Sequence, residues 1–72
     1  MKKLDLHGIK HQKASNMADT FIRQNKTKLP VEIITGNSID MQNIIKRIIK
    51  LYGLRMEPKS HVNLGSYIIR SN

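Results

Sequence analysis

The chain of 72 residues carries 13 Lys and Arg side chains against five Asp and Glu, which gives a formal net charge of +8. A chain of this length buries only about 60% of the surface that its unfolded form exposes, so residues 1–72 are expected to form one small domain. The absence of cysteine excludes disulfide bonds and thiolate metal sites. The strong positive charge favours nucleic acid as the partner over an anionic lipid surface or a role in solubility alone.

The first residues do not have the pattern of a secretory signal. Lys, Asp and His residues follow Met1 within ten positions and leave no apolar segment. No stretch approaches the roughly 18 apolar residues of a membrane span. We therefore expect a soluble, cytoplasmic protein without membrane association.

Two segments in the first half of the chain have clear periodicity. Leu4-Asp5-Leu6-His7-Gly8 alternates apolar and polar residues and ends in glycine, which predicts a strand that leads into a helix. Residues 12–25 have the spacing of an amphipathic helix, which the polar residues before Pro30 bring to an end. The apolar positions of this helix are Ala14, Met17, Ala18, Phe21 and Ile22.

A second strand and a second helix follow in the same order. Residues 31–35 are β-branched apart from Glu32 and lie between Pro30 and Gly36, which predicts a short buried strand. Residues 38–52 carry an apolar stripe at helical spacing, with Ser38 as the N-cap. The stripe consists of Met41, Ile44, Ile45, Ile48, Ile49 and Tyr52, and Gly53 follows it as a helix stop.

Residues 54–57 and 66–70 predict two final strands, joined by a loop that is too short for a crossover. These two strands should therefore be antiparallel. Right-handed crossovers make the first three strands parallel and place both helices on one side of the sheet. The predicted fold class is α/β, a two-layer α/β sandwich of order β-α-β-α-β-β. It has a four-stranded mixed sheet with two helices on one face.

Three loops should meet at one edge of this sheet, namely residues 5–8, residues 35–38 and the loop that leads to Gly65. Both helices begin at this edge, and helix N-termini favour anions such as phosphate. Gly8 and Gly36 allow the backbone to approach a ligand closely.

Several polar and aromatic side chains are candidates for ligand contact at this edge. Asp5 and His7 share strand parity, so they should project from the same face. Asn63 either donates to a ligand or shapes the turn before Gly65. Stacking on a nucleic-acid base has support only at Tyr67, because the other aromatic side chains fall on apolar helix stripes.

The charged residues on the polar face of the second helix are all basic. The face consists of Gln42, Asn43, Lys46, Arg47 and Lys50, and no acidic residue occurs between Asp40 and Glu57. Cations near a helix C-terminus complement the helix dipole, yet this purpose alone does not require a whole face. We interpret the face as a surface that contacts phosphate groups without distinguishing base sequence.

The chain resembles the Smr (small MutS-related) domain family over essentially its whole length. Leu4-Asp5-Leu6-His7-Gly8 matches the LDLHG opening of that family, and Ile34-Thr35-Gly36 falls where the family has TGxG or HGxG. Residues 63–70 are similar to its closing Gly-strand segment. The resemblance implies a fold like the C-terminal domain of a bacterial translation initiation factor, together with nucleic-acid binding. Several Smr proteins nick DNA or cleave RNA, and others are linked to ribosome quality control.

The family's motif residues map onto this sequence one by one. The Asp and His of LDLHG correspond to Asp5 and His7, and the Thr and Gly of TGxG correspond to Thr35 and Gly36. Ser38 stands where the family has the second glycine, and the loop before the second helix is shorter than in the family. Both departures affect the width of the crevice and any catalysis that depends on this loop.

Asp5 and His7 each allow a structural role beside a catalytic one. Asp5 either takes part in catalysis, or caps the first helix region or bonds to the Thr35-Gly36 turn. His7 can act as a general acid or base, bind phosphate, or pack as a satisfied side chain. His7 and His11 have HxxxH spacing without a Glu or Cys to complete a zinc set, so no metal site is predicted. Mg²⁺ is the one cofactor considered, shared between Asp5 and phosphate oxygens.

The leading hypothesis is a nucleic-acid-binding, monomeric Smr-like domain with endonuclease activity on DNA or RNA. The backbone of Gly36, Asn37 and Ser38 and nearby Lys or Arg side chains hold a phosphate. Asp5 orients His7 or positions a water or a metal ion, and His7 moves the proton. The alternatives are a non-catalytic module that binds RNA or the ribosome, and an adaptor for an acidic protein.

Overall fold

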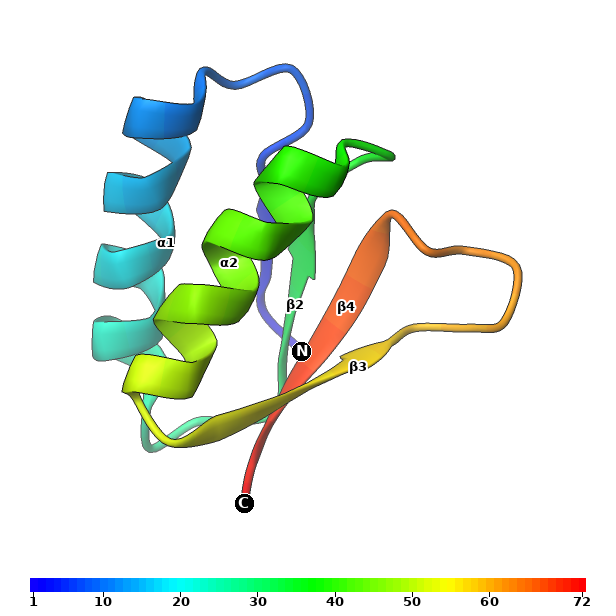
Figure 1. The fold of residues 1–72 in the computed structure, drawn as a ribbon. Coiled ribbons are helices and arrows are strands. Elements are labelled where there is room, and N and C mark those ends of the chain that lie inside the picture. The colour runs from blue at the N-terminus through cyan, green and yellow to red at the C-terminus, as the bar shows by residue number, and fades with distance from the viewer.

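Six elements make up the fold, and a computed structural model describes them over residues 1–72 (Figure 1). They are β1 (Lys3–Asp5), α1 (His11–Asn25), β2 (Val31–Ile34), α2 (Ile39–Leu51), β3 (Leu54–Pro58) and β4 (Ser66–Ser71). Their order is the predicted β-α-β-α-β-β, and each predicted boundary lies within one or two residues of the observed one.

The sheet has the strand order β1-β2-β4-β3. β1 and β2 are parallel, and β4 is antiparallel to both of its neighbours, β2 and β3. β3 therefore runs in the same direction as β1 and β2, although β4 separates it from them. Both helices cover one face of the sheet (Figure 1). The two-layer α/β sandwich is confirmed, and the insertion of β4 between β2 and β3 is the feature that the sequence did not reveal.

The core lies between the helices and the two central strands. Burial of a large aliphatic side chain contributes about 1.5–3 kcal/mol, so these contacts supply most of the stabilisation of so small a domain. Neither helix is long and apolar enough to cross a membrane. The ten residues of the buried cluster are Leu6, Ala14, Ala18, Ile22, Val31, Ile33, Met41, Ile45, Ile49 and Ile69.

The two helices begin in different ways. The Ser38 hydroxyl accepts the backbone N–H of Met41 at 3.1 Å, which makes Ser38 the predicted N-cap of α2. Lys10 precedes α1 and provides no side-chain cap. The position of α1 therefore depends on the packing of its apolar stripe against the sheet.

A buried carboxylate lies on the sheet face away from the helices. Glu32 is only 3% exposed, and its side chain accepts hydrogen bonds from the Ser66 hydroxyl and from Lys59 Nζ, the latter at 3.2 Å. These partners stabilise the ionised form, so the pKa of Glu32 lies below its ordinary value of 4.5 although burial acts in the opposite direction. The cluster links β2 to β4 and to the loop that follows β3.

The Glu32 cluster predicts loss of stability in acid. A carboxyl whose folded pKa is depressed contributes stability that is present above its unfolded pKa and lost as the pH falls through the folded pKa. We expect Glu32→Gln to lower the free energy of unfolding at pH 7 by about 1–3 kcal/mol. The variant should also lose less stability than the parent between pH 5 and pH 2. Urea unfolding followed by circular dichroism at several pH values measures both effects.

Glu57→Gln is the matched control, because Glu57 pairs with Arg55 and Arg70 at the exposed end of the sheet. Surface pairs of this kind contribute about 0–1 kcal/mol. Equal acid sensitivity of the Glu32→Gln variant and the parent would contradict the assigned role of Glu32.

Candidate functional site

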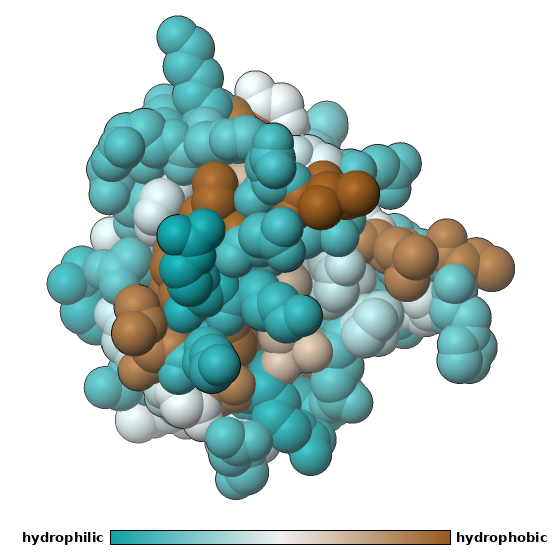
Figure 2. Space-filling model, viewed as in Figure 1, coloured by the Kyte–Doolittle hydropathy of each residue, from teal (hydrophilic) through white to brown (hydrophobic).

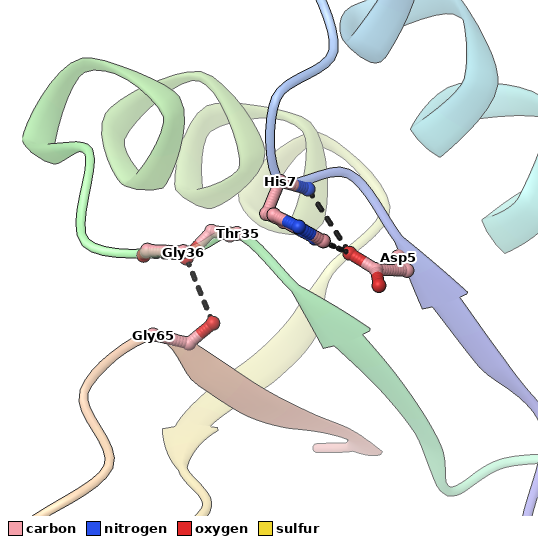
Figure 3. Close-up of polar contacts among 5 residues, drawn as sticks. All are labelled: Asp5, His7, Thr35, Gly36 and Gly65. Atoms are coloured by element: carbon pink, nitrogen blue, oxygen red, sulfur yellow. Dashed lines mark hydrogen bonds and ion pairs between the residues drawn. The ribbon is translucent and has the colours of Figure 1, made fainter.

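The three predicted loops do meet at one edge of the sheet. The backbone N–H groups of Thr35 and Gly36 both donate to the Gly65 carbonyl, at 2.8 and 3.0 Å (Figure 3). The Leu6 N–H donates to the Ile34 carbonyl at 2.7 Å and holds the first loop against the second. Residues 5–10, 35–38 and 63–65 are termed the loop edge below.

Two glycines are required by the close approach of these backbones. An added Cβ at Gly65 would lie 3.0–3.2 Å from backbone atoms of Gly36. Gly36 itself has φ of +72°, and a Cβ there would lie 3.2 Å from the Cβ of His7. Only glycine fits both positions without moving the neighbouring loop.

His7 and Asp5 form a contact pair on the loop edge. Asp5 Oδ1 accepts the backbone N–H of His7 at 3.1 Å and lies 2.7 Å from His7 Nδ1 (Figure 3). β1 ends at Asp5, so a tight turn brings the two side chains together, not shared strand parity. Asp5 neither caps α1 nor bonds to the Thr35-Gly36 turn, and those two suggested structural roles are wrong.

The Asp5 carboxylate orients the His7 imidazole through their hydrogen bond. The hydrogen bonds from His7 hold the pKa of Asp5 below its ordinary value of 3.8. Because an ionised carboxylate can only accept, Nδ1 of His7 carries the proton in this contact. Nε2 makes no hydrogen bond within the protein, so it can accept a proton whenever the ring is neutral. The His7 side chain is 71% exposed and that of Asp5 51%, so a ligand can reach both.

The loop between β2 and α2 does not offer all the backbone N–H groups that were predicted to bind a phosphate. The N–H groups of Thr35 and Gly36 are occupied by Gly65, and the buried Thr35 hydroxyl donates to the carbonyls of Gly36 and Gly65. The N–H groups of Asn37 and Ser38 make no backbone hydrogen bond, as is also true of Gly8. An anion at this edge would therefore meet Gly8, Asn37 and Ser38.

Ser38 occupies the position at which the Smr motif has its second glycine, and its backbone conformation does not require glycine. Its φ is −77°, a value open to any residue, and its side chain caps α2. No positive φ or close approach demands a glycine here. The side chain at this position therefore serves to cap α2.

Two amide side chains hold the third loop in place. Asn63 Oδ1 accepts the Gly65 N–H at 3.2 Å, so Asn63 shapes the turn, as one of its two suggested roles stated. Gln42 Nε2 contacts the carbonyls of Gly36 at 3.3 Å and Leu64 at 3.1 Å. This bridging role of Gln42 was not predicted, and its only signal in the sequence is an amide in the first turns of a helix that follows a glycine loop.

The basic residues of α2 are exposed but do not converge on the loop edge. Lys46, Arg47 and Lys50 have no carboxylate within 4 Å. At a rise of 1.5 Å per residue, Lys50 lies roughly 16 Å along α2 from the start of the helix. Lys46 borders a groove beside β3 and β4, whereas Arg47 borders the groove between the two helices. The basic face therefore extends away from the loops.

Most cations of the chain have no ion-pair partner. Four of the 13, namely Arg23, Arg55, Lys59 and Arg70, lie within 4 Å of a carboxylate. The other nine are Lys2, Lys3, Lys10, Lys13, Lys26, Lys28, Lys46, Arg47 and Lys50. Of the five Asp and Glu side chains, Asp40 makes no ion pair and Asp5 contacts only His7. The positive field is thus left largely uncompensated.

The protein groups alone do not assemble a metal site. No set of three or more His, Cys, Asp or Glu side chains could hold an ion. A magnesium ion at the loop edge would need phosphate oxygens to complete its coordination around Asp5.

No family model, curated protein or solved structure matches this chain. The resemblance to the Smr family therefore depends on the residues of the chain itself. Three short segments carry it: residues 4–8, residues 34–36 and residues 63–70.

The close approach at Gly65 predicts that Gly65→Ala disrupts the loop edge. We expect a loss of about 1–3 kcal/mol in the free energy of unfolding, because the added methyl group must displace the Gly36 backbone. The amide resonances of Thr35 and Gly36 should shift in NMR spectra, since both donate to Gly65. Gly53→Ala is the control, because a Cβ at Gly53 would meet no atom within 4 Å and Gly53 follows the far end of α2. The positive φ of Gly53 would strain the alanine but leave the loop edge unchanged. Unchanged Thr35 and Gly36 resonances in the Gly65→Ala variant would contradict the prediction.

Proposed function

We propose that this chain is a small Smr-like domain that binds nucleic acid and cleaves a phosphodiester bond at the loop edge. The observation that carries the proposal is the exposed Asp5–His7 pair, whose imidazole is oriented by the carboxylate and leaves Nε2 open to a ligand. The unoccupied N–H groups of Gly8, Asn37 and Ser38 lie in the same three-loop edge.

Electrostatics supports the binding step. Figure 2 shows a largely hydrophilic surface over α2, the helix that carries Lys46, Arg47 and Lys50. With nine unpaired cations, the domain attracts a polyanion from any direction, and phosphate contacts then release counterions. Contacts of this type position a strand without selecting its sequence.

The chemical step uses His7 as a general base. Nε2 takes the proton from the attacking oxygen, either water or a ribose 2′-hydroxyl, while that oxygen forms its bond to phosphorus and the bond to the leaving oxygen breaks. Asp5 stabilises the imidazolium that results and keeps the ring in place. The N–H groups of Asn37 and Ser38 stabilise the charge that develops on the phosphate oxygens.

One observation favours a non-catalytic RNA- or ribosome-binding module as the second candidate. Asp5 also accepts the backbone N–H of His7, so the pair stabilises the turn in the absence of any substrate. In this alternative the same loop edge and basic helix bind phosphate without cleavage.

The binding proposal predicts a steep dependence on salt. Loss of one cation that contacts phosphate should reduce the slope of log Kd against log salt by about 0.7–0.9. We expect this reduction for Lys46→Gln and for Arg47→Gln, measured by fluorescence anisotropy with labelled RNA and DNA. Lys28→Gln, in the exposed loop before β2, is the control that should keep the parental slope. Affinity that does not change with salt would instead support an adaptor for an acidic protein.

The catalytic proposal predicts separate effects of the two pair members. His7→Ala should reduce cleavage of RNA or supercoiled DNA by about 10²- to 10⁴-fold with little change in binding. The cleavage rate of the Asp5→Asn variant should lie between those of His7→Ala and the parent. The asparagine keeps the shape of the aspartate but not the charge that orients the His7 ring. His61→Ala, in the exposed loop after β3, is the control. Reactions with magnesium and with EDTA test the need for the ion.

Each result of the cleavage assay decides between the candidates. Cleavage that survives both His7→Ala and Asp5→Asn would overturn the proposed site. Salt-dependent binding without any cleavage by the parent protein would support the non-catalytic module.

A further inference from the structure

A small groove lies between residues of α2 and residues of the β3–β4 hairpin. Figure 1 shows these elements, with α2 on the side of the sheet that carries both helices. Its volume is about 240 Å³. Pockets for drug-sized molecules have volumes of roughly 300–1,000 Å³, so this groove admits little more than one ring system. It is lined by Gln42, Asn43, Lys46, Met56, Pro58 and Tyr67.

The inner side of the groove is an aromatic and apolar surface. Tyr67 is half-buried, packs against the core and lies opposite Pro58 in the β3–β4 pairing. Its hydroxyl makes no hydrogen bond within the protein, whereas the Tyr52 hydroxyl donates to Asp19 at 2.8 Å. Met56 adds a polarizable side chain beside the ring. A flat ligand could thus pack on this surface and bond to the free hydroxyl.

The α2 side of the groove supplies polar groups. Gln42 is fixed, because its amide nitrogen contacts the carbonyls of Gly36 and Leu64. Its amide oxygen has no partner and remains available as an acceptor. Asn43 is exposed and unbonded, and Lys46 has no ion-pair partner. The apolar surface is therefore bordered by three polar groups. They are the Gln42 amide oxygen, which accepts, the Asn43 amide, which donates and accepts, and the Lys46 cation.

We propose that this groove receives one unpaired base of a nucleic-acid strand whose backbone crosses the loop edge. The proposal rests on the proposed function. An unpaired base offers a π-face to Tyr67 and a hydrogen-bonding edge to Gln42 and Asn43, and its phosphate lies within the field of Lys46. A base within a regular duplex is stacked and cannot enter. The preferred substrate class is accordingly single-stranded or looped nucleic acid.

Gln42 connects the groove to the loop edge. The side chain that lines the groove also contacts the Gly36 carbonyl, and Gly36 packs against His7. A base in the groove and a phosphate at Asn37 and Ser38 would be held by adjoining parts of one surface. Recognition of an unpaired base would thereby set which phosphodiester lies near Nε2 of His7.

Fluorine NMR of protein labelled with 3-fluorotyrosine tests this inference directly. The chain has two tyrosines, and a Tyr52→Phe variant assigns their signals. We expect a single-stranded oligouridine or oligothymidine to shift the Tyr67 signal and leave the Tyr52 signal in place. A duplex of equal length should move neither signal, even at concentrations where it binds the basic surface.

Two variants separate stacking from folding. Tyr67→Leu removes the ring and should weaken single-strand affinity by roughly 5- to 100-fold, as for loss of one stacked base. Asn43→Ala alters an exposed side chain that the fold does not need, and it should weaken single-strand affinity without changing duplex affinity or stability. Asn16→Ala, an exposed amide on α1, is the control that should affect neither affinity.

These experiments distinguish a groove that binds no base from a protein that lacks the proposed function. Salt-dependent binding of nucleic acid with an unmoved Tyr67 signal and an inert Asn43→Ala variant would overturn the groove and leave the proposed function standing. Absence of all nucleic-acid binding would overturn both. A Tyr67 signal that responds to a polyglutamate peptide but to no oligonucleotide would assign the groove to a protein partner and overturn the proposal.

Discussion

The Gly65 carbonyl is the acceptor on which the arrangement of the site depends. It receives two N–H groups from the loop after β2, and this is feasible only because β4 lies beside β2 and begins at that point. The two backbones approach so closely that a Cβ at Gly65 would lie 3.0–3.2 Å from backbone atoms of Gly36. Gly36 has a positive φ of +72°, which favours glycine at that position as well. The same approach places Gly36 against His7, so that one local contact joins three segments that are distant in sequence. A small domain without disulfide bonds obtains a defined edge in this way.

Local periodicity was sufficient to predict the elements and the fold class. The stripe of Ile45 and Ile49 with its neighbours has helical spacing, and Ser38 and Gly53 mark the ends of α2 as expected. Local periodicity could not predict the strand order, because no local pattern indicates whether β4 pairs with β2. Glu32 illustrates the same limit. It was placed in a buried strand, yet its partners Ser66 and Lys59 come from segments that only the tertiary fold brings together.

The candidate site was predicted in its composition more accurately than in its geometry. Asp5 and His7 are in contact, but through a turn that the sequence did not indicate. Thr35 and Gly36 belong to the loop edge, but their N–H groups serve the fold and are not free to bind phosphate. Every buried backbone group needs a partner, and the choice of partner is made by tertiary contacts. A glycine loop before a helix therefore predicts an anion site correctly only when no neighbouring strand occupies its N–H groups.

Charge and chemistry are placed on different parts of this domain. The Asp5–His7 pair lies at the loop edge, whereas Lys50 lies roughly 16 Å along α2 at the helical rise of 1.5 Å per residue. Nucleic acid that engages both must extend over several nucleotides, because successive phosphates of a strand are separated by only about 3.4 Å of helix axis. Under the proposed function, affinity would then come mainly from α2, and reactivity from the Asp5–His7 pair together with the N–H groups of Asn37 and Ser38. Such a division would allow a variant to lose cleavage and keep binding, because the two properties would depend on different residues.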